Sequence, residues 1–309
     1  MDMRVLVTGA NGFVGKNLIG RLSTMPGLSI VATDLHGDFS GDKAECITYL
    51  KGDLSDPEFM DSLRNLFSFD AIVHLAAVLP QNEDAKTGST VMNFNFNTTY
   101  LLLEIARICK SRFLFPSTAL IYGSENRAPF TEEMTPAPEN SYALSKHMSE
   151  ELIRLYAQKY DLSSAIFRIG VLYGAGQKGN MFIPSMVEKI LKGEEFSMTG
   201  GEQVRDFIYV TDLVDLLSKA LGEKSDVNGT FNAGSGTAQS IKDAALLIES
   251  AAGRKGLLNI GALPYRENEI WNYCLDNKKA CAAFDWKPQV SLQEGLRRTV
   301  EAAESQTGK

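Results

Sequence analysis

The sequence has few cysteines and few histidines. No two cysteines stand in a Cys-x-x-Cys spacing, and the histidines are scattered along the chain. They are Cys46, Cys109, Cys274 and Cys281, and His36, His74 and His147. Disulfide frameworks and zinc sites use clustered cysteines or histidines. We therefore expect reduced thiols in a cytoplasmic protein, and no metal site.

Long apolar runs and basic clusters are also missing. No apolar stretch approaches the roughly 20 residues that span a bilayer. The first strand-like segment begins at Arg4, so we expect no signal peptide. The net charge is −7 without a basic run. Nucleic acid and an anionic membrane are therefore not expected as partners, whereas a few local arginines could still bind an anionic substrate.

The composition is that of an ordinary globular protein. Hydrophobic residues make up 44% of the 309 residues and charged residues 22%, which is typical of soluble proteins. A chain of this length buries a large core and forms one large domain or two lobes.

A glycine-rich turn follows the first apolar segment. Residues 4–8 have the pattern of a buried strand, and residues 16–22 have helical periodicity. Strand, glycine turn and helix together are typical of dinucleotide binding. Gly9 would permit the tight turn, Gly12 a close approach to a pyrophosphate, and Gly15 close packing of the helix on the strand. The alternative is a glycine-rich turn that binds nothing.

Asp34 stands where the cofactor ribose would need a carboxylate. The apolar run 28–33 predicts a second strand, and Asp34 follows it at 19 positions after Gly15. The usual spacing is about 20 residues. A carboxylate there would hold the adenosine ribose diol and repel a 2′-phosphate, and no arginine follows it. We therefore predict NAD rather than NADP. The alternative is a strand-end aspartate that caps a turn.

The next segments alternate between strand and helix patterns. We expect strands at 46–50, 71–74 and 113–115, and a long apolar helix at 91–110. Such alternation predicts a parallel sheet with helices on both faces and ligands at the carboxyl ends of the strands. The expected fold class is α/β, a doubly wound parallel sheet (Rossmann) with a smaller α/β substrate lobe.

Tyr142 and Lys146 are four residues apart. On a helix both side chains emerge on the same face. A neighbouring ammonium favours phenolate and would lower the pKa of Tyr142 toward the working pH. Such a tyrosine can take a proton from an alcohol while hydride leaves for a nicotinamide. A solvated helix face is the alternative for this pair taken alone.

Together these segments resemble the extended short-chain dehydrogenase/reductase family, in its NAD-dependent sugar epimerase/dehydratase branch. Residues 8–15 are similar to T-G-x-x-G-F-[IV]-G, and residues 74–77 to H-L-A-A. Residues 117–123 are similar to S-[ST]-x-x-V-Y-G, and residues 205–212 to R-D-F-I-Y-V-x-D. Tyr142 and Lys146 form the family's Y-x-x-x-K. The matches run nearly from end to end of the chain.

The resemblance implies a catalytic set of Thr118, Tyr142 and Lys146, with Ser117 adjacent. Tyr142 would be the general base toward a sugar hydroxyl, Lys146 would hold the nicotinamide ribose, and Thr118 would hydrogen-bond the reacting oxygen. Ser117 and Thr118 could instead be strand-end hydroxyls that satisfy a loop backbone. The resemblance implies NAD contacts from Gly9, Asn11, Gly12, Phe13, Val14, Gly15, Asp34, Asp53, Leu54, Leu75, Ala76, Ala77, Asn95, Tyr142, Lys146 and Ile169.

Substrate contacts are implied by two arginines. Arg205 stands at the family position that pairs with a nucleotide-sugar pyrophosphate, which suits a guanidinium fork. Residues 266–269 resemble R-x-G-[DE], so Arg266 and Glu269 would contact phosphate and nucleotide ribose. Two surface arginines in ion pairs are the alternative. We expect a nucleoside-diphosphate sugar or a related sugar as substrate.

Two departures from the family pattern bear on the reaction. Val171 stands where many members have an asparagine that helps to hold the substrate, so the substrate is less sharply implied. Ala119 and Leu120 stand where 4,6-dehydratases carry an Asp-Glu pair and decarboxylases a glutamate. Without that acid, plain oxidation of a sugar carbon is favoured, followed by return of hydride or release of a keto product.

We therefore expect an NAD-dependent sugar-nucleotide epimerase acting at C4. The alternatives are a dehydrogenase or reductase of a sugar nucleotide or sugar acid, and a non-catalytic dinucleotide-sensing protein. The NAD-binding domain should comprise 1–174 and about 205–234, and the substrate lobe 175–204 and 235–309. Loops 79–84 and 180–196 should shape the substrate pocket.

Two helices carry more apolar residues than one buried side needs. They are expected at 91–110 and 142–160. Helices of this kind pair across a two-fold axis in many oligomers. We predict a homodimer with a four-helix interface.

Overall fold

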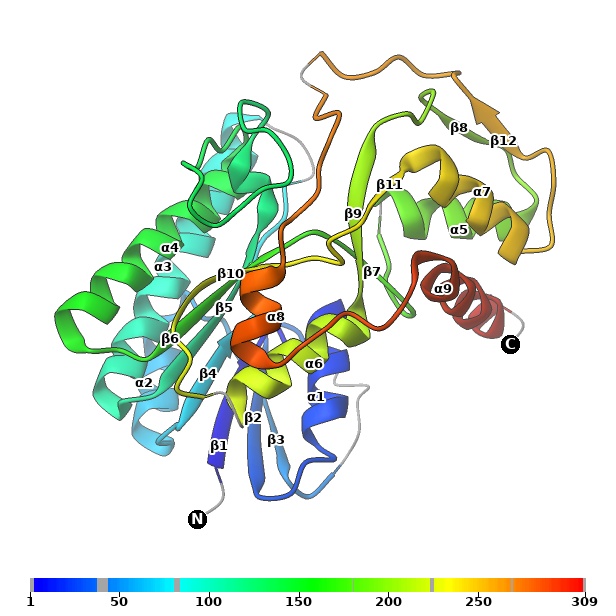
Figure 1. Cartoon of the computed structure of the whole chain (residues 1–309). Coiled ribbons are helices and arrows are strands. Elements are labelled where there is room, and N and C mark those ends of the chain that lie inside the picture. Colours follow the sequence, from blue (N-terminus) through cyan, green and yellow to red (C-terminus); the bar gives the residue numbers. More distant parts are fainter. Residues whose placement is uncertain are drawn as a thin grey trace.

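The computed structural model describes residues 3–37, 44–80, 84–179, 181–222, 225–267 and 269–307. Asn268 of the predicted phosphate motif, and residues 81–83 and Asn180 of the predicted pocket loops, lie outside these ranges. Figure 1 shows a large lobe built on a central sheet and a smaller lobe beside its upper edge. No helix within the described ranges is long and apolar enough to cross a bilayer.

In the part of the chain that the structure describes, seven parallel strands form the central sheet, in the order β10-β6-β5-β4-β1-β2-β3. The predicted doubly wound α/β fold is confirmed, and its strands begin and end close to the expected positions. The strands are β1 (Met3–Thr8), β2 (Leu28–Asp34), β3 (Ile47–Lys51), β4 (Ala71–His74), β5 (Arg112–Thr118), β6 (Ser164–Ile169) and β10 (Gly229–Ala233).

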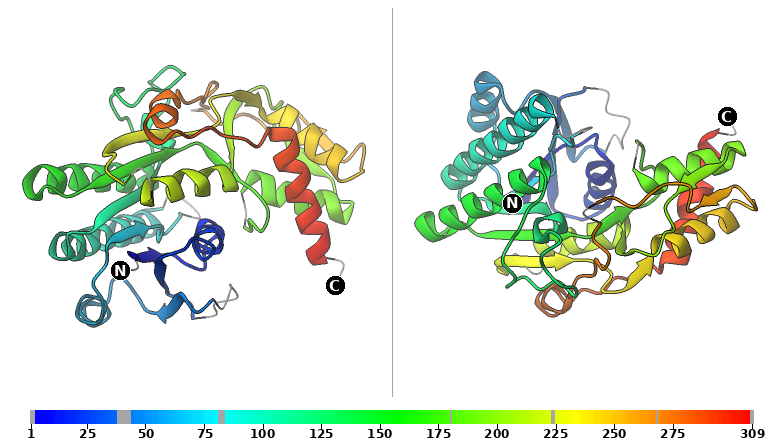
Figure 2. Two further views of the ribbon diagram at one scale, coloured as in Figure 1. Left: turned by 60° about the horizontal axis from the view of Figure 1, so that its bottom comes forward. Right: turned by 90° about the horizontal axis from the view of Figure 1, so that it is seen from above.

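Helices cover both faces of this sheet (Figure 2). Along β1, Val5 and Val7 pack in the core with α1, whereas Leu6 between them packs in the core with α2, α3 and α4. This alternation is the period of two of a strand that is buried on both faces. The helices on one face are α2 (Pro57–Leu66), α3 (Ala85–Cys109) and α4 (Ser141–Tyr160), and those on the other are α1 (Phe13–Leu22), α6 (Val210–Leu221) and α8 (Lys278–Phe284).

Side-chain caps set where the two long helices begin. Asp84 accepts a hydrogen bond of 2.8 Å from the Thr87 N–H at the start of α3, and Asn140 accepts one of 2.8 Å from the Ala143 N–H at the start of α4. Such caps satisfy N–H groups that have no partner within the helix. Apolar periodicity placed the start of this helix at residue 91, whereas the cap at Asp84 starts α3 at Ala85.

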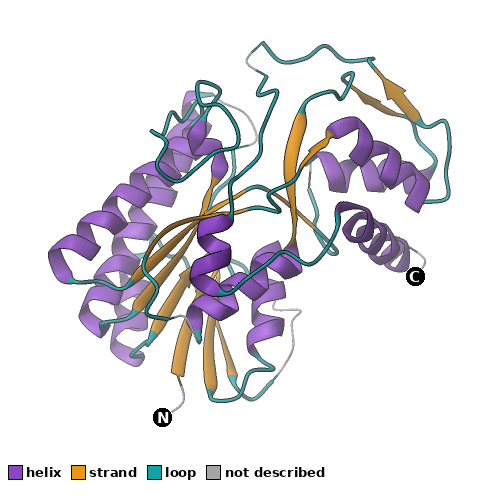
Figure 3. Cartoon of the chain, viewed as in Figure 1, coloured by secondary structure: helices purple, strands orange, loops and turns teal. Residues whose placement is uncertain are grey.

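Within the described ranges, the small lobe contains two short sheets and three helices. Figure 3 shows them beside the large lobe. One sheet consists of β7, β9 and β11, the other of β8 and β12. The chain leaves this lobe after β9, passes through α6 and β10 of the large lobe, and returns. The elements of the small lobe are β7 (Val171–Tyr173), α5 (Phe182–Lys192), β8 (Phe196–Met198), β9 (Val204–Tyr209), β11 (Ala238–Ser240), α7 (Ile241–Ala251), β12 (Leu258–Ile260) and α9 (Leu292–Thr307).

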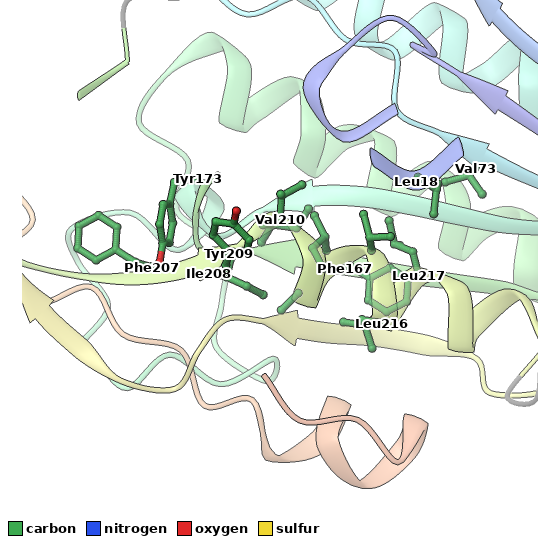
Figure 4. Packing of buried hydrophobic residues seen from close by; sticks show 14 of the residues in the cluster. Leu18, Val73, Phe167, Tyr173, Phe207, Ile208, Tyr209, Val210, Leu216 and Leu217 are labelled. Atoms are coloured by element: carbon green, nitrogen blue, oxygen red, sulfur yellow. The ribbon is translucent and has the colours of Figure 1, made fainter. Parts of the chain in front are cut away.

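The hydrophobic core that contains Val5 and Val7 runs through both lobes. Leu18 and Phe167 of the large lobe belong to the same buried cluster as Tyr173, Phe207 and Tyr209 of the small lobe (Figure 4). Close packing of this kind resists displacement of one lobe against the other. The core therefore fixes where the small lobe stands relative to the carboxyl ends of the central strands.

Candidate active site

The glycine turn between β1 and α1 packs against the segment after β4. Gly9 has a φ of +66°, and a Cβ there would lie 2.7 Å from the backbone nitrogen of Ala76. A Cβ at Gly15 would lie 2.2 Å from the carbonyl oxygen of Gly9. The left-handed backbone at Gly9 and both close approaches require glycine. These two residues bring the start of α1 against the ends of β1 and β4.

The N-terminus of α1 is open to an anion. The helix begins at Phe13 after Gly12, has no side-chain cap, and has no acidic residue in its first turn. Unpaired N–H groups and the helix dipole attract negative charge there. Phe13 and Val14 contribute the first N–H groups of the helix. The residues that are present therefore fit the pyrophosphate of a dinucleotide.

Asp34 ties the glycine turn to the end of β2. Its Oδ2 accepts a hydrogen bond of 2.9 Å from the Asn11 N–H, and its Oδ1 accepts one of 3.1 Å from the His36 N–H. The Asn11 amide donates at 2.6 Å to the His36 carbonyl. Each carboxylate oxygen retains a lone pair for a ribose hydroxyl. Asp34 therefore stabilises the turn and remains suited to hold the ribose.

Other predicted cofactor residues lie at the same edge of the sheet. Leu75, Ala76 and Ala77 follow β4 and are half-buried, and Ile169 ends β6 and is buried. Asp53 and Leu54 follow β3. The Asp53 carboxylate accepts the N–H of Ser55 at 2.8 Å and its O–H at 2.7 Å, while Leu54 is buried in the core.

Asn95 of α3 holds the loop after β4 against α4. Its Oδ1 accepts a hydrogen bond of 2.7 Å from the Val78 N–H. Its amide nitrogen donates to the Val78 carbonyl at 3.1 Å and to the Ser145 hydroxyl at 3.0 Å. The amide is thus fully used within the chain, so we assign Asn95 a part in positioning this loop.

Tyr142 and Lys146 lie in the first two turns of α4. The Lys146 ammonium donates a hydrogen bond of 2.9 Å to the Pro116 carbonyl and lies 4.4 Å from the ring centre of Phe115. Lys146 is buried and Tyr142 is half-buried. Lys146 therefore contacts the end of β5, one turn after Tyr142 on the same helix.

Burial shifts the pKa of both groups. It raises the pKa of Tyr142 to about 12, and it lowers the pKa of Lys146 to about 8 against the opposing charge of Glu150. The prediction that Lys146 lowers the pKa of Tyr142 is wrong for this structure. The physical reason is that loss of hydration disfavours phenolate, and the ammonium is engaged with Pro116 and Phe115.

His74 at the end of β4 also lies near Lys146. Its Nδ1 is 2.9 Å from the Thr8 hydroxyl, which accepts the Ala76 N–H at 3.1 Å. Burial, and then the charge of Lys146, hold the pKa of His74 well below its ordinary value. A neutral His74 therefore joins β1, β4 and the following loop without adding a second positive charge.

Thr118 and Ser117 at the end of β5 have different surroundings. The Thr118 hydroxyl accepts the Leu120 N–H at 3.2 Å, at the start of the short 3-10 helix η1 (Ala119–Tyr122). It donates to no acceptor among the described residues, so its proton remains available to a ligand. Ser117 instead donates a hydrogen bond of 2.6 Å to the Glu150 carboxylate. Ser117 is committed to that buried contact, so we leave it out of the proposed catalytic set.

Sequence reasoning missed a buried charge cluster between α4 and β6. Glu150 of α4 and Arg168 of β6 form an ion pair of 2.8 Å, with both side chains almost completely buried. Arg154 also reaches Glu150 at 2.8 Å. The available signal was an arginine inside the apolar strand Ser164–Ile169 and a glutamate four residues after Lys146.

The structure brings Arg205 and Glu269 together. The Arg205 guanidinium forms an ion pair with the Glu269 carboxylate and donates to the carbonyls of Val204 at 2.9 Å and Ile270 at 2.6 Å. Arg266 is exposed and makes no hydrogen bond or ion pair with any residue in the described ranges. Of the predicted substrate residues, Arg205 and Glu269 therefore form a pair that Arg266 does not join.

Tyr273 is a further residue at the site that the sequence did not reveal. It is buried, its ring packs edge-on against Phe130 at 5.5 Å, and the Arg205 guanidinium carbon lies 5.9 Å from its ring centre. Burial raises its pKa, with smaller upward effects from Asp206 and Tyr142. Tyr273 thus packs against Arg205 and is close enough to Tyr142 for the two phenols to affect each other. A lone tyrosine in an irregular segment carries no periodic signal.

Comparison with known proteins extends over the whole chain. A family model described as "NAD dependent epimerase/dehydratase family" matches residues 5–234. A putative UDP-glucose 4-epimerase of Methanocaldococcus jannaschii is 30% identical over 302 residues, which cover 96% of this chain and 97% of that protein. A dTDP-glucose 4,6-dehydratase of Escherichia coli is 26% identical, covering 97% of this chain and 92% of that protein.

Comparison with solved structures also finds epimerases. A UDP-glucose 4-epimerase of Thermotoga maritima with UDP-glucose has a TM-score of 0.89 and 27% identity, covering 99% of this chain and 100% of the other. A UDP-glucose 4-epimerase of Thermus thermophilus in complex with NAD has a TM-score of 0.86 and 27% identity, covering 98% and 99%. NAD is accordingly the cofactor, and the chain belongs to the NAD-dependent epimerase/dehydratase branch of the extended short-chain dehydrogenases/reductases.

Proposed function

We propose that this protein epimerises a nucleoside-diphosphate sugar at C4. The observation that carries the proposal is Lys146, held between the Pro116 carbonyl and the Phe115 ring one turn after Tyr142. This arrangement stands at the end of the sheet where the glycine turn fits a dinucleotide. Bound NAD supplies the hydride acceptor and later the donor. The chain's own residues must then hold the sugar and move one proton.

Tyr142 is the proposed base toward the sugar hydroxyl. Its pKa of about 12 means that it carries its proton at neutral pH. It becomes a base only when positive charge close to its oxygen lowers that pKa. Lys146 does not lower that pKa in the structure itself. We propose that it does so once NAD and substrate are bound, because its pKa of about 8 leaves it mostly protonated at neutral pH, one turn away on the same helix. Thr118 would donate its free proton to the reacting oxygen.

The Arg205–Glu269 pair is proposed to receive the nucleotide part of the substrate. A guanidinium binds phosphate through charge-assisted hydrogen bonds, and a carboxylate accepts ribose hydroxyls. Arg205 is only partly exposed, so it is not a freely solvated surface arginine. UDP-glucose is the first substrate to test, because three of the similar proteins named above are described as UDP-glucose 4-epimerases and one of them was solved with UDP-glucose.

Elimination is less well supported than epimerisation. Ala119 is buried and Leu120 is partly exposed on η1, and neither carries the acid that a dehydratase would need at this position. A dehydrogenase remains the second candidate. It is favoured by Val171 of β7, whose side chain is partly buried against the hydrophobic core and offers no amide to the substrate.

A second copy of the chain is the proposed partner. On α4, Leu144, Met148 and Leu155 are exposed and lie within a narrow arc of the helix, and Tyr100 of the neighbouring α3 is also exposed. An apolar stripe on two adjacent helices suits a symmetric helix pairing. This proposal is the four-helix homodimer that the sequence suggested.

The test follows nucleotide and sugar together. The purified protein is denatured to identify released NAD, and the intact protein is incubated with UDP-glucose or UDP-galactose without added cofactor. Formation of the other sugar without net NADH supports the epimerase. Accumulating NADH indicates the dehydrogenase instead. Tyr142→Phe should retain NAD but lose turnover by about 10²- to 10⁴-fold, the contribution typical of a general base. Unchanged turnover in that variant would refute the role of Tyr142.

A further inference from the structure

The catalytic helix α4 carries a second ionisable residue that the proposed reaction does not use. Glu150 lies one turn after Lys146 on the same helix, and its side chain is completely buried. The Ser117 hydroxyl donates to Oε1 of Glu150 at 2.6 Å, and the Arg168 guanidinium donates to Oε2 at 2.8 Å. Glu150 is therefore held by two neighbouring strands of the central sheet.

The strand register explains why these groups meet. Ser117 of β5 and Arg168 of β6 are direct partners in the parallel ladder. Phe115, two residues before Ser117 and thus on the same face of β5, lies under the Lys146 ammonium. The same face of the sheet thus contacts Lys146 and Glu150.

The charges around these two residues are few. Lys146 faces Glu150 on its own helix and the neutral His74 of β4. Glu150 faces Arg168 of β6 and Arg154 of α4. Arg168 is further held by the Tyr122 hydroxyl at 3.1 Å and the Glu132 carbonyl at 3.3 Å. Glu150 is the negative charge that acts on Lys146, opposing the effect of burial.

Stability alone gives a weak reason for this arrangement. Well-packed apolar residues usually replace a buried ion pair with little loss of stability, or with a gain. A buried glutamate beside the proposed catalytic lysine therefore calls for a role in the site itself.

We propose that Glu150 is a positioning residue for the proposed reaction: its carboxylate, fixed by Arg168, supplies the negative charge that keeps Lys146 an ammonium, and its bond to Ser117 ties the catalytic helix to the strand that ends in Thr118. The inference rests on the proposed function, because it assigns Glu150 an action through Lys146. Glu150 itself touches neither substrate nor cofactor in this account.

The first experiment measures the titration of Lys146 directly. NMR of isotope-labelled lysine, with the Lys146 signal assigned from Lys146→Met, gives its midpoint in the protein without substrate. Glu150→Gln keeps the shape of the side chain and removes its charge. We expect its Lys146 midpoint to fall by about 1 pH unit, the lower end of the effect of a neighbouring opposite charge. An unchanged midpoint would overturn the proposal.

A second variant is needed in case Glu150→Gln folds poorly, because that substitution leaves the Arg168 charge buried without its partner. Glu150→Gln combined with Arg168→Gln removes both charges of the ion pair. A fall in the Lys146 midpoint is again expected, but a smaller one, because the Arg168 cation that opposes the effect of Glu150 is removed with it. Ile153→Ala, a fully buried change on the same helix, is the matched control. It should lower the melting temperature and leave the midpoint in place.

Activity adds a second readout and separates this inference from the proposed function. With UDP-galactose as the probe, the alkaline limb of the kcat profile should move to lower pH in both Glu150 variants and stay in place in Ile153→Ala. Ser117→Ala should lower kcat severalfold without moving the limb, because it removes the tie and keeps the charge. If Tyr142→Phe is fully active, the proposed function fails. If Tyr142→Phe is inactive but the Glu150 variants titrate like the wild type, only the inference fails.

Discussion

Arg205 of β9 forms an ion pair with Glu269, which lies 64 positions later in the chain. Both residues were implied as substrate contacts, yet in this structure each is the partner of the other. The Arg205 guanidinium also donates to two backbone carbonyls. Under the proposed function, a substrate diphosphate would join or replace Glu269 at a guanidinium that is already oriented.

Arg205→Met should weaken substrate binding. A hydrogen bond to a charged group contributes roughly 1.5–3 kcal/mol, so we expect KM for UDP-glucose to rise about 10- to 100-fold while bound NAD is retained. Steady-state kinetics and NAD content after denaturation measure both quantities. Arg254→Met, at an exposed arginine of the small lobe, is the control. Equal KM values for Arg205→Met and the control would contradict the assignment.

Gly9→Ala should disrupt the cofactor turn. A non-glycine residue in the left-handed region costs about 1–2 kcal/mol, and the added Cβ would also lie 2.7 Å from the Ala76 nitrogen. Gly253 has a φ of +61° with no atom within 4 Å of an added Cβ. Gly253→Ala thus measures the backbone strain alone. Urea unfolding should show a larger loss for Gly9→Ala, and NAD titration should show weakened binding only for that variant.

The sequence predicted the sheet well because buried parallel strands read as short apolar runs between turn residues. The run 71–74 is β4 itself. The start of α3 was placed too late, because residues 85–90 are small or polar and the cap at Asp84 sets that boundary. Hydrophobic periodicity indicates which residues are buried. It gives no information on a cap, which is a local hydrogen bond at the end of a helix.

The site was predictable where it depends on local spacing and missed where it depends on tertiary contact. Gly9, Gly15 and the Tyr142–Lys146 pair follow from positions within one turn or one helix. The burial that raises the pKa of Tyr142, and the contact of Ser117 with Glu150, arise from segments that meet only in the folded chain.

Buried Lys146 should leave a signature in the pH dependence of stability. Burial lowers its pKa from 10.5 to about 8. Between these values the unfolded chain holds a proton that the folded chain lacks, so the free energy of unfolding rises with pH, by up to about 3 kcal/mol. The gain begins near pH 8 and is complete above the pKa of the unfolded lysine.

Lys146→Met should remove that rise. Urea unfolding at pH 7 and pH 10 gives the free energy of unfolding of each protein, and the difference between the wild type and the variant should increase toward pH 10. The comparison is restricted to this difference because Tyr142, whose pKa burial raises to about 12, acts in the opposite direction above pH 10. Parallel curves for the two proteins would argue against a depressed pKa.

Leu155→Glu should break the proposed homodimer. Leu155 is 52% exposed on the apolar stripe of α4, and a glutamate there would be desolvated in a helix pairing without a partner. Light scattering should give twice 33.9 kDa for the wild type and 33.9 kDa for the variant. Leu66→Glu, at a 70% exposed position of α2, is the control and should leave the mass unchanged. A monomeric wild type at micromolar concentration would refute the dimer.

The crossing of the chain between lobes has a consequence for biosynthesis. β6 ends at residue 169, and the strand that covers its edge, β10, ends at residue 233. Synthesis runs from the N-terminus, so a nascent chain presents an uncovered β6 edge for tens of residues of elongation. An uncovered edge strand pairs readily with other chains. Chains that terminate between α6 and β10 should therefore accumulate as aggregates, whereas chains released after β10 can close the sheet.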